Sequence, residues 1–168
     1  METIRHILDK TITTNIDLSN LLDYLGIPHF IGMRDEFNSD VLSRHQFFIL
    51  NIQPRNMTGQ HWTALYRKIL PNNKSQCIFF DSYGSSPMKE IVTACKRLNI
   101  PLSYSNNMYQ SFESENCGFF CVAFLLCMAK GLPFKSFANL FSDKEERNDR
   151  IVKRLITKEL IKIQNKNN

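Results

Sequence analysis

Apolar residues recur with helical spacing near the start of the chain, after an N-terminal stretch that shows no clear period. Leucines between residues 18 and 25 fall on one helical face, which predicts a short helix. Asp17 or Ser19 can cap its N-terminus, and Gly26 stands where a left-handed residue commonly ends a helix. The mostly apolar residues 29–35 are expected to form an extended or loop segment.

Several short apolar runs instead have the length and spacing of strands. Residues 47–52 (FFILNI) predict a strand that is buried on both faces. The runs at 61–69 and 76–81 are separated by the turn sequence PNNK at 71–74, which predicts an antiparallel hairpin. Residues 102–104 predict one further short strand.

Helical patterns return in the second half of the chain. Residues 88–98 predict a helix, and residues 117–130 are apolar on nearly all sides, which is typical of a buried helix. Ser142 and Glu145 have the spacing of a capping box. They predict a charged amphipathic helix over about 143–164, with one apolar stripe.

The composition is that of a globular protein. Of 168 residues, 43% are hydrophobic and 22% are charged, and the six glycines do not cluster, which argues against a glycine-rich phosphate loop. We find no repeat or linker and expect a single α+β domain over 1–168. No apolar run approaches the length of about 18 residues that spans a bilayer, and residues 1–10 lack the apolar core of a signal peptide. We therefore expect neither membrane insertion nor secretion.

Net charge and cysteine count give only weak indications of the binding partner and of the cellular compartment. The net charge of +5 permits contact with polyanions but does not require it. The C-terminal stretch 143–168 holds eight Lys or Arg and five Asp or Glu, so its helix is either a solvated face or a DNA contact. The five cysteines are an odd number, which favours reduced thiols inside a cell.

A histidine and an aspartate lie at matching ends of the predicted hairpin. His61 begins the first strand and Asp81 ends the second, and these positions are neighbours in an antiparallel pair. A carboxylate there would orient the imidazole and fix its tautomer. The alternative is a solvated histidine at a strand end and an aspartate that caps a loop.

Cys117 opens the predicted buried helix after a polar loop. The partial positive charge at a helix N-terminus favours the thiolate, and a nearby His61 would complete an ion pair able to attack an acyl carbon. Gln110, in the same loop, could donate to an oxyanion. The alternatives are an inert buried thiol and a surface amide. We assign Cys121 and Cys127 to the core of the buried helix. Cys117, Cys121 and Cys127 lack the spacing of a zinc site, so we expect no metal there.

The residues around these positions resemble those of known viral proteases. The matching segments are Gly-Gln-His-Trp at 59–62, Phe-Phe-Asp-Ser-Tyr-Gly at 79–84, Gln-Ser-Phe at 110–112 and Asn-Cys-Gly-Phe-Phe-Cys at 116–121. Together they resemble the adenain-like cysteine proteases, whose superfamily includes the SUMO-deconjugating proteases. The resemblance covers roughly residues 18–130, the expected catalytic core.

The resemblance implies a papain-like fold with a permuted chain order, in which a small mixed or antiparallel central sheet packs against the nucleophile helix and further helices surround it. By motif position, Cys117 corresponds to the nucleophile, His61 to the general base, Asp81 to the third triad member and Gln110 to the oxyanion donor. Trp62 and Gly118 correspond to residues beside the substrate. No metal ligand is implied.

The function implied is a viral endopeptidase that cleaves capsid or core precursor proteins during virion maturation. The Asn-, Lys- and Ile-rich composition suggests a virophage or polinton-like virus, with the enzyme in the virion and the host-cell interior (viral factory or nucleus). Adenain binds a peptide cofactor through a cysteine that residues 99–107 lack, so we expect no required cofactor, while activation by DNA stays open. The alternatives are a deconjugating protease for ubiquitin-like modifiers and a non-catalytic nucleic-acid-binding structural protein.

Overall fold

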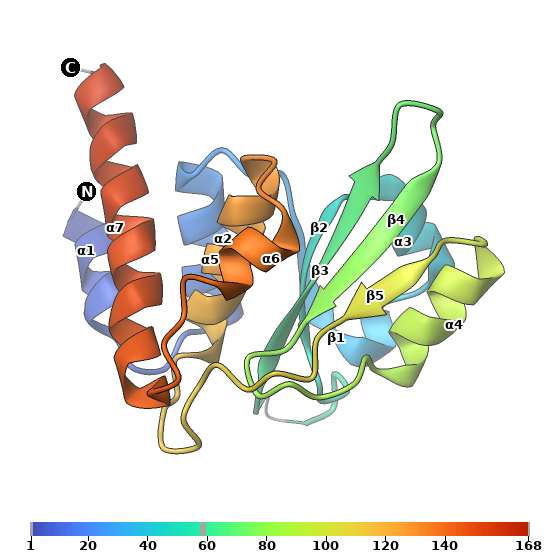
Figure 1. Ribbon diagram of the computed structural model, residues 1–168, viewed down its shortest axis with the longest axis horizontal. Helices are drawn as coiled ribbons and strands as arrows, with labels where there is room; N and C mark the ends of the chain where they lie inside the picture. The colour runs from blue at the N-terminus through green and yellow to red at the C-terminus, as the bar shows by residue number, and fades with distance from the viewer. Residues whose placement is uncertain (1, 58–59, 168) are drawn as a thin grey trace.

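The computed structural model describes residues 2–57 and 60–167 and shows a five-stranded sheet with helices on both faces (Figure 1). The strands are β1 (Phe30–Met33), β2 (Phe47–Asn51), β3 (Trp62–Ile69), β4 (Ser75–Phe80) and β5 (Leu102–Tyr104), and they lie in the sheet in this order. The central pairs β2–β3 and β3–β4 are antiparallel, whereas the edge strands β1 and β5 pair in parallel with β2 and β4. The sheet is therefore mixed.

The helices divide unequally between the two faces of the sheet (Figure 1). One side carries α1 (Glu2–Asp9), α2 (Asn15–Tyr24), α5 (Cys117–Ala129), α6 (Phe134–Ala138) and α7 (Asn148–Asn167). The other side carries α3 (Ser39–Arg44) and α4 (Lys89–Arg97). Short 3-10 turns at Arg34–Glu36 and Glu145–Arg147 complete the described elements.

The sheet has an apolar core on each face, because alternate residues of a strand point to opposite sides. On the α5 side, Ile49, Ala64 and Phe80 join a buried cluster with the helices. On the α3 and α4 side the strands contribute Phe48, Leu50, Leu65, Cys77 and Phe79. This burial on both faces explains why β2 reads as a continuous apolar run.

Helix α5 is buried along almost its whole length. Every residue from Cys117 to Met128 is buried, as expected for a helix that is apolar all round. Its Phe124 ring stacks on Phe80 of β4, with ring centroids 5.1 Å apart. The helix thus lies between the sheet and the outer helices and gives Cys117 a rigid support.

Helix α2 confirms the predicted leucine helix but begins earlier than expected. Thr14 is its N-cap: the Thr14 hydroxyl accepts from the Asp17 backbone N–H, and the Asp17 carboxylate accepts from the Thr14 N–H. Neither Asp17 nor Ser19 is the cap, because Asp17 serves as the third residue of a capping box. Gly26 has φ +70°, the left-handed conformation predicted for it.

The predicted start of the C-terminal helix was wrong. Residues 145–147 form a 3-10 turn, and α7 begins at Asn148. The Ser142 hydroxyl accepts a local bond from the Lys144 N–H, and the Asn148 amide bonds both the N–H and the carbonyl of Ser142. The Ser142 side chain therefore bonds within this turn and does not cap a helix, and Asn148, the first residue of α7, fixes the turn through its two bonds to the Ser142 backbone.

Strands β2 to β5 and the longer helices were predicted, and β1 lies in the segment expected to be extended or a loop, whereas α1, α3 and α6 were not predicted. These three have eight residues or fewer, too short for a helical period to stand out. Residues 58 and 59, part of the polar turn before β3 and of the Gly-Gln-His-Trp segment, lie outside the described residues. Among the residues described, no helix has the length and apolar character needed to cross a bilayer.

Candidate active site

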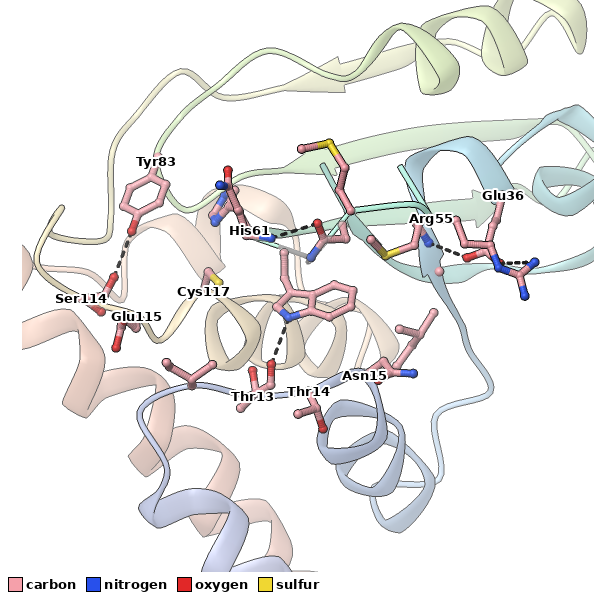
Figure 2. Close-up of a pocket in the computed structure, with 18 of the residues that line it drawn as sticks. Thr13, Thr14, Asn15, Glu36, Arg55, His61, Tyr83, Ser114, Glu115 and Cys117 are labelled. Carbon is pink, nitrogen blue, oxygen red and sulfur yellow. Dashed lines mark hydrogen bonds and ion pairs between the residues drawn. The ribbon is translucent and has the colours of Figure 1, made fainter. Parts of the chain in front are cut away.

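A cleft of about 880 Å³ opens beside the N-terminus of α5. Its walls come from residues 12–15 before and at the start of α2, from 31–33 of β1, from 60–62 and from part of the loop 112–117 (Figure 2). Segments from distant parts of the sequence therefore meet around one cavity.

The His61 and Asp81 side chains form a buried pair at one end of this cleft. The β3–β4 register places Ala64 opposite Phe80, so His61 just before β3 and Asp81 just after β4 come together. The His61 Nε2 lies 2.6 Å from Asp81 Oδ1, and the two residues are 8% and 3% exposed. The same carboxylate oxygen accepts from the Tyr83 backbone N–H at 2.9 Å. The predicted contact is present, and it follows from the hairpin.

Cys117 is the first residue of α5 and lines the same cleft. Its thiol lies near enough to His61 to help raise the pKa of the imidazole, and Figure 2 shows both residues at the same end of the cavity. Because Nε2 of the ring faces Asp81, Nδ1 is the nitrogen left for the sulfur. The three residues therefore lie in the order thiol, imidazole, carboxylate.

Electrostatics keep the imidazole charged at neutral pH. Burial lowers the pKa of His61, but the hydrogen bonds and charges of Asp81 and then of Cys117 outweigh it and raise this pKa to about 9. Burial raises the pKa of Asp81, whereas the His61 hydrogen bond and charge and the Tyr83 N–H bring the pKa of this carboxyl below its usual value. The site can thus hold an imidazolium between two groups able to carry negative charge.

Tyr83 forms a wall of the site that our interpretation of the sequence did not single out. Its ring lies 4.7 Å from the His61 ring, centroid to centroid, and its hydroxyl donates to the Ser114 carbonyl at 2.9 Å (Figure 2). On its other side it stacks with Phe112, whose side chain is 77% exposed. Tyr83 therefore restricts the orientation of the imidazole. The sequence could have indicated this role, because Tyr83 lies two residues after Asp81 within the matched segment 79–84.

Trp62 lines the cleft, and its contact with substrate stays a prediction. Its indole N–H donates to the Thr13 carbonyl at 3.2 Å, which ties the segment before α2 to the start of β3 (Figure 2). Gly118 has a different surrounding: a Cβ there would lie 2.1 Å from Thr13 Oγ1 and 2.8 Å from Leu18 Cδ2. Gly118 is thus required for the close packing of α5 on this segment, and its contact with substrate stays a prediction.

Gln110 is completely buried and does not belong to the described cleft lining. Its Oε1 accepts from the Ser82 hydroxyl at 2.6 Å, and its Nε2 donates to the Ser114 carbonyl at 2.7 Å. The structure therefore places its side chain against Ser82 and Ser114, within the base of the loop that precedes Cys117, rather than in the cavity. Its role as an oxyanion donor stays a prediction and requires an N–H to turn from Ser114 towards the substrate.

Two groups of residues near the site gave no signal in the sequence. Residues 12–15 line the cleft although they precede the expected core of 18–130. Asn148 and Asp149, at the start of α7, bond the loop before Cys117. Neither group lies near a matched motif or shows a pattern that distinguishes it from ordinary helix ends.

The remaining cysteines differ from Cys117 in their surroundings. All five thiols are free and buried, but of these Cys117 is the one that lines the cleft. Burial raises the pKa of Cys121 well above its usual value and that of Cys127 to about 11. Within residues 2–57 and 60–167, no group of three or more His, Cys, Asp or Glu is arranged to hold a metal ion.

Comparison with known proteins identifies a similar fold. A scan against protein-family models finds no match, and neither does a search of curated proteins. Among solved structures, the chain is similar to "SUMO protease Ulp1 with the catalytic cysteine oxidized to a sulfinic acid", with a TM-score of 0.51 and 13% sequence identity over 95% of this chain and 84% of that chain. At this identity the likeness concerns the fold. It confirms the expected α+β architecture with a mixed sheet, similar to that of a cysteine protease.

Proposed function

We propose that this protein is a cysteine endopeptidase whose triad is Cys117, His61 and Asp81. The observation that carries the proposal is an imidazole bonded to a buried carboxylate and lining the same cleft as a neighbouring thiol, which helps to raise the pKa of the imidazole. A charged imidazole beside a cysteine is the arrangement that activates a sulfur nucleophile. The similarity in fold to a SUMO protease supports the same chemistry.

In this mechanism the Cys117 thiolate attacks the scissile carbonyl carbon, and the carbonyl oxygen takes the negative charge. The imidazolium of His61 then donates its proton to the leaving amine as the C–N bond breaks, which leaves a thioester. The neutral His61 next takes a proton from water, whose oxygen attacks the thioester carbon; the C–S bond then breaks, the sulfur leaves as the thiolate and His61 keeps the proton, which restores the starting ion pair. Asp81 keeps the ring oriented throughout.

Stabilisation of the oxyanion is assigned to two kinds of donor. In the first turn of α5 the backbone N–H groups of Phe119 and Phe120 bond the Asn116 carbonyl, so we assign this role to the N–H groups of Cys117 and Gly118, which have no acceptor within the helix. Gln110 would add a side-chain N–H if its amide turned from Ser114. One such donor is typically worth about 10²- to 10³-fold in turnover.

For the substrate we propose capsid or core precursor proteins of a virophage or polinton-like virus, cleaved during virion maturation inside the host cell. The proposal rests on the motif resemblance and composition. We propose that no cofactor is required and leave DNA activation, through the basic C-terminal helix, to a direct test: added oligonucleotide either raises the rate or does not. A second candidate, deconjugation of a ubiquitin-like modifier, is favoured by the fold shared with a SUMO protease.

The decisive test of the chemistry is Cys117→Ala against Cys127→Ala, a substitution in the same helix but away from the cleft. We expect Cys117→Ala to lower hydrolysis of fluorogenic peptides by about 10⁴-fold or more with an unchanged circular dichroism spectrum, and Cys127→Ala to retain turnover. Undiminished hydrolysis by Cys117→Ala would refute the proposal.

Substrate class is tested separately with precursor-derived peptides and modifier–fluorophore conjugates. Cleavage confined to the conjugates would move the assignment to deconjugation. Tight DNA binding without thiol-dependent hydrolysis of either substrate would instead support a structural nucleic-acid-binding protein.

A further inference from the structure

The start of α7 holds the loop that leads into Cys117. Asp149 Oδ1 accepts from the Ser114 hydroxyl at 2.9 Å, and Asp149 Oδ2 accepts from the Asn116 amide at 2.8 Å. The neighbouring Asn148, which is fully buried, donates to the Tyr109 carbonyl at 2.9 Å. Two adjacent residues of one helix therefore hold both ends of the loop 109–116.

Ser114, one of the two residues that Asp149 holds, is the meeting point of the site's polar contacts. Its carbonyl accepts from the Tyr83 hydroxyl at 2.9 Å and from Gln110 Nε2 at 2.7 Å. Tyr83 in turn packs against the His61 ring. The position of Ser114 thus determines where the candidate oxyanion donor and the wall of the imidazole lie.

Asn116, the other residue, directly precedes Cys117 and is itself buried. Its Nδ2 faces Asp149, and its Oδ1 is buried with no hydrogen-bond partner among the described residues. An unsatisfied buried acceptor is unfavourable, so the amide would not take this orientation unaided. A hydrogen bond to a carboxylate is stronger than a neutral one, and Asp149 therefore imposes the orientation.

We propose that Asp149 is a positioning residue for the nucleophile. It acts through Ser114 and Asn116 to hold the loop that sets the place of Cys117, and it touches neither substrate nor the reacting atoms. This inference rests on the proposed cysteine protease activity. The alternative is a merely structural role, in which an acidic residue in the first turn stabilises α7 through the helix dipole.

The test substitutes Asp149 by Ala and by Asn and measures kcat, KM and the alkylation rate of Cys117 by iodoacetamide, followed by peptide mass spectrometry. Asp149→Ala is expected to lower kcat by about 10- to 100-fold with little change in KM, because small displacements of a reacting group carry a large cost. Alkylation of Cys117 should slow in parallel. Asp149→Asn, which keeps one carbonyl oxygen and so one of the two contacts, should fall between Ala and wild type.

Glu159→Ala is the matched control, since Glu159 is another acidic residue of α7 and bonds Lys130 at 2.6 Å. We expect it to lower the melting temperature at most and to leave kcat and Cys117 alkylation unchanged. The double variant Asp149→Ala/Ser114→Ala should lose less kcat than the sum of the two single effects, because both substitutions remove the same Ser114–Asp149 hydrogen bond.

The outcomes separate this inference from the proposed function. If wild type hydrolyses peptides and Asp149→Ala matches it in kcat, or loses no more than Glu159→Ala, the positioning role is refuted while the protease stands. If wild type hydrolyses nothing, the proposed function fails, and the alkylation rates alone decide. Slower Cys117 labelling in Asp149→Ala then supports positioning, and labelling as fast as wild type or faster refutes it.

Discussion

The two halves of the site are held in place by different kinds of structure. The His61–Asp81 half depends on a hairpin that brings together two residues 20 positions apart and whose strands are joined by the hydrogen-bond ladder of the sheet. Cys117 stands at the start of the buried helix α5, but the segments on either side of it are held by side-chain bonds, from Trp62 to the N-terminal segment and from Asp149 to the loop before α5. A ladder is lost only when the sheet unfolds, whereas a few side-chain bonds can fail singly. We therefore expect the Cys117 half to be the more easily disturbed of the two.

The largest effect in the hairpin half is expected from Asp81→Asn. An amide cannot stabilise the imidazolium as a carboxylate does, so kcat/KM should fall by about 10²- to 10⁴-fold. The pKa of His61, raised to about 9 largely by Asp81, should fall as well. In wild type, kcat/KM should decline as pH rises through about 9, because His61 loses the proton it gives to the leaving amine.

Asp81→Asn should move this alkaline limb to lower pH, as a pH–rate profile will show. If the alkaline limb does not move, it reports the titration of a group other than His61.

The His61–Asp81 pair should also make the free energy of unfolding depend on pH. The stabilisation from His61 is complete below pH 6.5 and is lost as pH rises through about 9, and the stabilisation from Asp81 is lost in acid as the carboxyl protonates. Denaturant unfolding of wild type and Asp81→Asn across pH 4 to 10 measures this difference.

An intermediate effect is expected from Gln110→Ala, which tests whether the Cys117 half supplies an oxyanion donor. Loss of the amide should lower turnover by about 10²-fold if an N–H turns to the oxyanion. Ser82→Ala is the comparison, because it removes the bond to Gln110 Oε1 and leaves the N–H groups in place. Equal rates in Gln110→Ala and wild type would remove Gln110 from the mechanism.

The smallest effect is expected from Gly118→Ala, which tests the packing of α5 on the N-terminal segment. Alanine gains about 1 kcal/mol in helix propensity over glycine, but its Cβ would lie 2.1 Å from Thr13 Oγ1. Overpacking typically costs about 1–3 kcal/mol, so we expect a net loss of about 1 kcal/mol in the free energy of unfolding.

Thr13→Ala should restore much of that loss, since the Thr13 hydroxyl is buried without a hydrogen-bond partner among the described residues. Urea unfolding of the two single variants and the double variant measures the coupling. If the two substitutions change the free energy of unfolding additively, the close contact between residue 118 and Thr13 does not cause the loss in Gly118→Ala.

Predictions of secondary structure succeeded where the pattern was long or strongly apolar. Strands β2, β3 and β4 and helix α5 have such patterns, because both faces of the sheet and all sides of α5 are buried. The capping box at Ser142 failed because a nearby side chain, Asn148, bonds the same residue more fully. Spacing along a sequence cannot show that competition.

The chain's own residue order already contained the His61–Asp81 contact, since hairpin register follows from strand length and turn position, and it marked Cys117 as the start of a buried helix. Tertiary packing alone brought the Thr13 carbonyl to Trp62, bonded Gln110 to Ser82 and set Asp149 on the loop before the nucleophile. These contacts join residues 49, 28 and 35 positions apart through single side chains, and such pairs leave no periodicity in the sequence.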